Sequence, residues 1–236
     1  MKKVTVTLCI ISLILQSCIS QSNFDLSDIT LNENIKDLPI EKLDLYEKDF
    51  FLSSEYSGHT IYDKQFLNFK GVALEGRIHP NTNYLRNSVS FWFSKKDNII
   101  SILEINIHTH DECTEFVNVL IKKLGNPNYI RFENKKERER DNPSNYLWED
   151  TVNNRTYFLD VYKDYQTKKY EKAHLYMLKN SDTIVYPTMF DFPEYGYYGE
   201  FIDERSKKQD PTYTYQQYVA DKVKRGRGEY ENYYTK

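Results

Sequence analysis

One stretch of the sequence constrains the fold more than any other. From Ser88 to Ser94 apolar and polar residues alternate, and after the turn residues at 95–98 a second alternating run covers 99–108. Alternation with a period of two is typical of strands that bury one face. Because the connection is short, the two strands should pair as an antiparallel hairpin. We therefore predict a β-hairpin over these residues.

A helix is predicted directly after this hairpin. Thr109 and Glu112 have the spacing of a capping box, and Gly125 with Pro127 supplies a stop. The apolar residues between these signals recur at helical spacing, namely Phe116, Leu120 and Leu124.

Further strand candidates lie on both sides of this helix. Residues 66–78 have a strand-like pattern with possible bends at Gly71 and Gly76. The order of strands, one helix and strands predicts an α+β fold, in which an antiparallel sheet has one main helix packed on a face, with an irregular N-terminal lead-in and a C-terminal extension. The lead-in should pack as short irregular or helical pieces, for example around Leu31–Leu38. The strand candidates after the helix are Tyr146–Asp150, Thr156–Lys163 and Ala173–Lys179.

The composition indicates an unusual core. Hydrophobic residues make up 39% of the 236 residues, and 21 tyrosines are included in that share. Ordinary globular domains have roughly 45–50% apolar residues. We therefore expect tyrosine to share the core, although many tyrosines lie after residue 194 and so outside the predicted core.

The charge balance argues against nucleic-acid binding. The 32 basic and 35 acidic side chains give a formal net charge of −3, so the chain has no general positive field for a phosphate backbone. Residues 131–141 alternate in sign and are predicted to form a solvated loop. Outside the N-terminus, the sequence has no apolar run of the length that a membrane-spanning helix needs.

The N-terminus has the features of a signal peptide. Lys2 and Lys3 precede a mostly apolar stretch from Val4 to Leu15, which is too short to span a bilayer stably. This stretch runs into Leu15-Gln16-Ser17-Cys18, which resembles the lipobox of bacterial prolipoproteins. The resemblance implies cleavage between Ser17 and Cys18 and lipidation of Cys18, with acyl chains such as palmitate.

The same resemblance implies a location and a partner. An Asp directly after the lipidated cysteine is associated with the inner membrane, and Ile19 stands there, which favours the outer membrane. The partner is then the membrane, reached through Cys18, with a possible protein partner in the cell envelope. Cys9 leaves with the signal peptide, so Cys113 remains without a disulfide partner and is predicted to be a small buried residue.

The region after Tyr186 differs from the rest. We expect an extended aromatic segment over 186–198, followed by one short helix capped by Thr214 and Gln217 and ended near Gly226. The predicted units are a signal peptide (1–17), a lipidated tether (18–27), an acidic lead-in (28–59), the α+β domain (60–185), and an aromatic wrap with a basic tail (186–236).

The sequence contains few candidate catalytic or metal-ligating residues. His108 and His110 could ligate a metal, with His59, His79 or His174 as a third ligand, but the predicted helix start separates them. Glu149 and Asp150 are neighbours on a strand and should point to opposite faces. We therefore predict no catalytic residue, no metal site and no cofactor.

These observations favour a membrane-anchored bacterial lipoprotein that acts as a non-catalytic binding or interaction module. One alternative is a toxin-neutralising immunity lipoprotein, because the chain is small and acidic and has no catalytic motif. The other is a metal-dependent hydrolase that uses His108 and His110.

Overall fold

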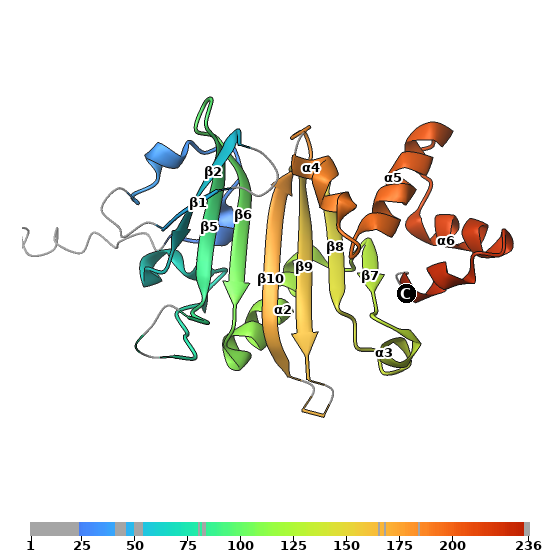
Figure 1. Ribbon diagram of the computed structural model, residues 1–236, viewed down its shortest axis with the longest axis horizontal. Helices are drawn as coiled ribbons and strands as arrows, with labels where there is room; N and C mark the ends of the chain where they lie inside the picture. Colours follow the sequence, from blue (N-terminus) through green and yellow to red (C-terminus); the bar gives the residue numbers. More distant parts are fainter. Residues whose placement is uncertain are drawn as a thin grey trace, which may run out of the picture.

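The structure is a computed structural model with one eight-stranded antiparallel sheet and helices on both of its faces (Figure 1). This confirms the predicted α+β fold. The described residues are 24–40, 46–49, 54–79, 81, 84–164, 166–167, 169–183 and 185–233.

The sheet consists of two meanders whose last strands pair at its centre. Its strand order is β1-β2-β5-β6-β10-β9-β8-β7, with β6 antiparallel to β10. The first meander is β1 (Tyr46–Asp49), β2 (Tyr56–Ile61), β5 (Ser88–Ser94) and β6 (Ile100–Ile107). The second is β7 (Tyr129–Arg131), β8 (Asn145–Asp150), β9 (Arg155–Lys163) and β10 (Tyr170–Lys179).

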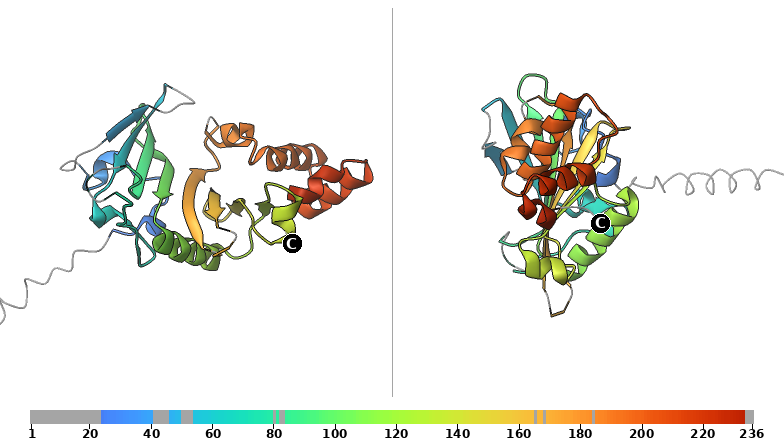
Figure 2. Two further views of the ribbon diagram at one scale, coloured as in Figure 1. Left: turned by 60° about the horizontal axis from the view of Figure 1, so that its bottom comes forward. Right: turned by 90° about the vertical axis from the view of Figure 1, so that its right-hand side faces the viewer.

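Helix α2 (His110–Leu124) joins the two meanders. Its 15 residues span about 22 Å at 1.5 Å per residue. The chain must pass four strand spacings from β6 to β7, which is about 19 Å. The length of the helix therefore matches the crossing that it makes beneath the sheet (Figure 2).

The predicted ends of this helix are confirmed, but the predicted capping box is not. Thr109 is the N-cap residue, and Gly125 closes the helix with φ 74°, a backbone conformation that favours glycine. Glu112 does not return to the Thr109 backbone. Its Oε2 accepts hydrogen bonds from the Gly76 N–H at 3.0 Å and from Asn87 Nδ2 at 2.6 Å, so it holds the loop before β5.

The first core lies between α2 and the sheet, and the N-terminal segment is part of it. Short 3₁₀ helices η1 (Leu26–Asp28) and η2 (Ile35–Asp37) bury Leu26 and Ile35 there. The predicted tether up to residue 27 was therefore wrong for residues 24–27, whereas η2 is a short packed piece of the kind expected in the lead-in over 28–59. That range also contains β1 and most of β2.

Residues 64–73 form a short hairpin rather than one long strand. The 3₁₀ helix η3 (Lys64–Phe66) precedes β3 (Asn68–Phe69), which pairs with β4 (Val72–Ala73). Lys70 and Gly71 connect these strands with φ values of 50° and 84°, as in a two-residue type I′ turn.

The second core lies on the opposite face, under the C-terminal helices (Figure 2). We predicted an extended segment over 186–198, and the structure instead has α4 (Val185–Thr188), η4 (Met189–Asp191) and the beginning of α5 (Gly196–Lys208). Helix α6 (Tyr215–Lys224) confirms the later helix, with the Thr214–Gln217 capping box. The 3₁₀ helix η5 (Gly228–Tyr233) follows it.

Tyrosines supply much of this second core. The expectation that those after residue 194 lie outside the core was wrong. A buried Tyr needs a partner for its hydroxyl, and Tyr218 and Tyr230 both donate to Glu200, while Tyr129 donates to the Glu194 carbonyl at 2.9 Å. The buried tyrosines after 194 are Tyr195, Tyr198, Tyr213, Tyr215, Tyr218 and Tyr230.

The charged stretch 131–141 contains one turn of helix, α3 (Lys135–Glu139), where we expected only a loop. The side chain of Asn134 caps it by accepting from the Glu137 N–H at 3.1 Å. No residue of this helix is buried, so its solvated character agrees with the prediction.

The variant Phe201→Ala tests whether the C-terminal helices unfold cooperatively with the rest of the domain. It is 1% exposed and packs on the rings of Tyr198 and Tyr215. We expect Phe201→Ala to lower the free energy of unfolding by about 3–5 kcal/mol, as for other buried aromatic truncations, in urea denaturation. Val152→Ala, at a residue 91% exposed, should change it by less than about 0.5 kcal/mol. A loss below about 1 kcal/mol for Phe201→Ala would contradict a shared core.

Candidate binding groove

A row of polar side chains crosses the face of the sheet that carries the C-terminal helices. Side chains alternate between the faces of a strand, and the register places one polar residue from each of six strands opposite the next. The row therefore presents a continuous line of hydrogen-bonding groups. In order across the sheet it consists of Ser88, Asn106, His174, Asp160, Asn145 and Arg131.

Glu104 anchors one end of this row. Its side chain is buried, and its Oε2 accepts from Trp92 Nε1 at 2.8 Å. Its Oε1 accepts from Asn106 Nδ2 at 2.9 Å and lies 3.1 Å from His174 Nε2. Both oxygens act as acceptors, as they do in an ionised carboxylate. This carboxylate fixes the orientation of His174.

Asp160 organises the other end of the row. Its Oδ1 accepts from Asn145 Nδ2 at 2.6 Å and from the Tyr195 hydroxyl at 2.5 Å. Burial, with the charge of Asp160 beside it, raises the pKa of Tyr195 well above its usual value, so its hydroxyl stays a donor. Arg131 Nη1 donates to Asn145 Oδ1 at 3.2 Å and lies 4.0 Å from Glu194.

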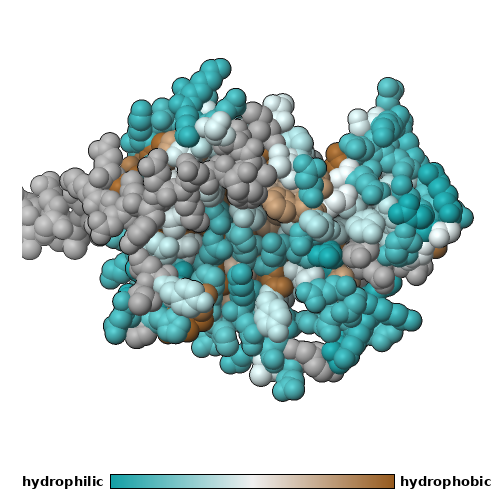
Figure 3. Space-filling view, in the orientation of Figure 1, coloured by the Kyte–Doolittle hydropathy of each residue, from teal (hydrophilic) through white to brown (hydrophobic). Residues whose placement is uncertain are grey.

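A hollow opens over this end of the row. It has a volume of about 290 Å³ and is lined by residues of β7, β8, β9 and β10 together with Glu194. A second hollow of about 420 Å³ shares four of these residues and continues past α3. We call the two together the polar groove. The face on which it lies is mainly hydrophilic below the C-terminal helices (Figure 3). The shared residues are Glu133, Ser144, Val161 and Tyr162.

Tyr162 stands between the two hollows and is 59% exposed. It follows Asp160 on the same face of β9, and Lys172 is its partner across to β10. His174 is likewise opposite Asp160. The exposed Tyr162 thus has Asp160, Lys172 and His174 as neighbours on this face of the sheet.

Comparison with known proteins gives no match for this chain. No family model, curated protein or solved structure matches the chain. The polar groove is therefore interpreted from its own residues.

The predicted lipidation and cleavage residues, Cys18 and Ser17, lie outside the described residues. Among the described residues, no helix is both long and apolar enough to cross a bilayer. The third cysteine, Cys113, is fully buried, as predicted, and burial raises the pKa of its thiol to about 12.

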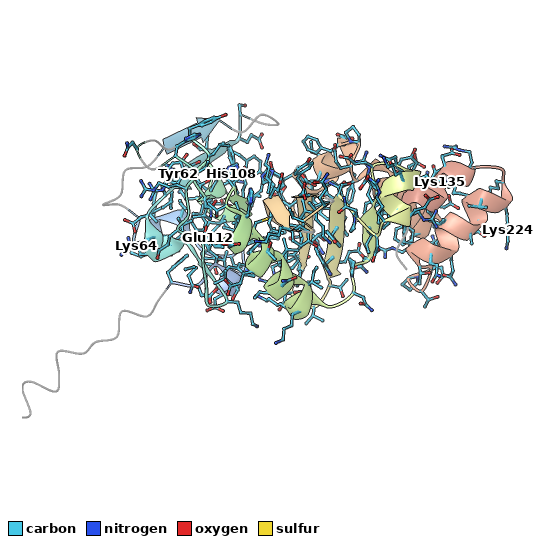
Figure 4. All side chains as sticks on the ribbon, turned by 90° about the horizontal axis from the view of Figure 1, so that it is seen from below. Tyr62, Lys64, His108, Glu112, Lys135 and Lys224 are labelled. Atoms are coloured by element: carbon cyan, nitrogen blue, oxygen red, sulfur yellow. The ribbon has the colours of Figure 1, made fainter. Side chains whose placement is uncertain are left out.

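The structure separates His108 from His110. His108 follows β6, and Glu112 lies on the first turn of α2 (Figure 4). His110 is exposed at the first position of that helix. Burial, together with the nearby Lys172 and His174 side chains, lowers the pKa of His108. In the described part of the chain, no group of three or more His, Cys, Asp or Glu side chains is arranged to hold a metal ion.

Glu149 and Asp150 point to opposite faces, as predicted. Arg205 of α5 binds Glu149 with both terminal nitrogens, at 3.1 and 3.3 Å. Asp150 pairs instead with Arg155 at 3.4 Å. These carboxylates hold neighbouring elements together and do not form an acid–base pair.

Sequence reasoning did not find the polar groove. The alternation along 99–108 separates Glu104 and Asn106 from the apolar residues of their strand, but the sequence contains no signal for strand order. His174, Asp160 and Asn145 become neighbours only through the pairing of β10 with β9 and of β9 with β8.

Glu104→Gln tests whether the buried carboxylate holds the row together. The amide nitrogen cannot accept, so at least one of the hydrogen bonds from Trp92, Asn106 or His174 is lost. We expect the free energy of unfolding to fall by about 1–3 kcal/mol, measured by urea denaturation. Glu171→Gln, at a partly exposed position on β10, is the control and should change it by less than about 0.5 kcal/mol. Equal stability of Glu104→Gln and the unmodified chain would contradict this role.

Proposed function

We propose that the protein is a lipid-anchored lipoprotein of the bacterial cell envelope whose folded domain binds a ligand in the polar groove without catalysis. The observation that supports binding is the convergence of polar groups from four strands on one hollow, beside an exposed Tyr162. Ligand sites are typically concave, with a few placed polar groups.

The anchor would hold this domain close to the membrane. Phe24, the first described residue, packs on Phe66 with ring centroids 4.8 Å apart. Only residues 19–23 separate it from Cys18. Six residue steps extend to at most about 21 Å. A lipid on Cys18 would therefore keep Phe24 within about 21 Å of the bilayer surface, with the outer membrane as the favoured location.

Mass spectrometry of the N-terminal peptide tests the anchor. Protein extracted from membranes should begin at Cys18 and carry acyl chains, because several chains are needed for firm anchoring. Cys18→Ser should abolish the modification and release the protein from the membrane fraction. Thiol titration gives an independent readout, since the mature protein should have one reactive thiol, Cys113, and only after denaturation. An unmodified Cys18 in membrane-derived protein would refute the anchor.

Thermal-shift screening of purified protein tests binding in the groove. A panel of amino acids, dipeptides and neutral oligosaccharides should contain a compound that raises the melting temperature, because ligands that bind only the native state stabilise it. Lys172→Ala removes a charged group of the groove and should reduce this shift. Glu171→Ala, a neighbour on β10, is the matched control. A panel with no stabilising compound would refute ligand binding of these classes in the groove.

A further inference from the structure

The groove presents donors and acceptors that the fold does not use. Asp160 receives its two hydrogen bonds on Oδ1, so within the described residues its Oδ2 remains available. His174 uses Nε2 toward Glu104, at 3.1 Å, so its second ring nitrogen, Nδ1, takes no part in that contact. Lys172 lies opposite Tyr162 and is exposed, and it forms no ion pair within the described part of the chain. A carboxylate oxygen, an imidazole nitrogen and an ammonium group therefore lie within one small area.

The charges of the groove are mixed. The first hollow is lined by Arg131 and Lys172 against Glu133, Asp160 and Glu194. The second adds further side chains of both signs together with two amides. A ligand with a large net negative or net positive charge would meet like charges at close range, which is unfavourable. The groove therefore suits a neutral ligand whose groups both donate and accept. The additional side chains are Glu137, Lys163, Asp164, Asn142 and Gln166.

Tyr162 adds an apolar surface to this polar setting. Its ring is 59% exposed on a strand whose other residues are largely buried. A tyrosine ring offers contact area at low entropic cost, with a hydroxyl at its end. A pyranose ring has the complementary structure, because its C–H groups form an apolar face and its hydroxyls lie around the edge.

We propose that the groove binds a neutral oligosaccharide, with a sugar ring on Tyr162 and hydroxyls bonded to Asp160, His174 and Lys172. The two adjoining hollows of about 290 and 420 Å³ are together within the size range of small-ligand sites. They provide space for sugar units on both sides of Tyr162. This assignment rests on the proposed ligand-binding function and names its substrate class.

An array of neutral oligosaccharides tests the assignment. It should cover linkages of glucose, galactose, mannose and N-acetylhexosamines, and the full chain purified in detergent should be applied to it, with affinities measured by calorimetry. The unmodified chain should bind at least one oligosaccharide. Tyr162→Ala should weaken that binding at least tenfold, because it removes the stacking surface. Tyr84→Ala replaces a tyrosine that is 67% exposed in the loop before β5, and it should bind normally.

The outcomes separate this assignment from the wider function. Failure of every oligosaccharide to bind, or full binding by Tyr162→Ala, would overturn the assignment. If zwitterionic dipeptides bind instead and lose affinity in Lys172→Ala, the sugar class is wrong but the groove is still a binding site. If neither class binds, both proposals fail. The melting temperature of each variant shows that loss of binding is not loss of fold.

Discussion

β6 and β10 are the final strands of their meanders, and they pair over six successive positions, from Ala173 with Ile107 to Leu178 with Ile102. This contact turns two small antiparallel sheets into one and gives α2 a continuous surface to cover. The same pairing aligns Asn106 with His174. The first core and the polar row therefore depend on one strand contact.

The two faces of the sheet are stabilised in different ways. The face under α2 is aliphatic and aromatic, and Leu103, Ile105 and Leu175 are buried there. On the same strands, Glu104, Asn106 and His174 point to the opposite face. Their burial is tolerated because each side chain is hydrogen-bonded. Removing one partner from such a network leaves another polar group without compensation. The polar face thus fixes the strand register more strictly than apolar packing alone would.

Elements with local signals could be predicted from the sequence, and those without them could not. The hairpin of β5 and β6, both ends of α2 and the capped helix α6 each have short-range patterns of alternation, spacing or capping residues, and all three were predicted correctly. Helix α5 was missed because Gly196, Gly199 and a run of tyrosines have low helix propensity, and its stability comes from packing of Tyr198 and Phe201 in the second core. The groove required strand order, which no local pattern encodes.

The second core and the polar groove meet at Tyr195. Tyr195 is buried in the aromatic core, with Phe158 at 4.8 Å between ring centroids, yet its hydroxyl reaches Asp160 in the polar row. Tyr129 bridges in the same way to the carbonyl of Glu194. A phenylalanine at position 195 would fill nearly the same volume but would leave Asp160 without this donor. Tyrosine thus provides both packing and hydrogen bonding at the border between the second core and the groove.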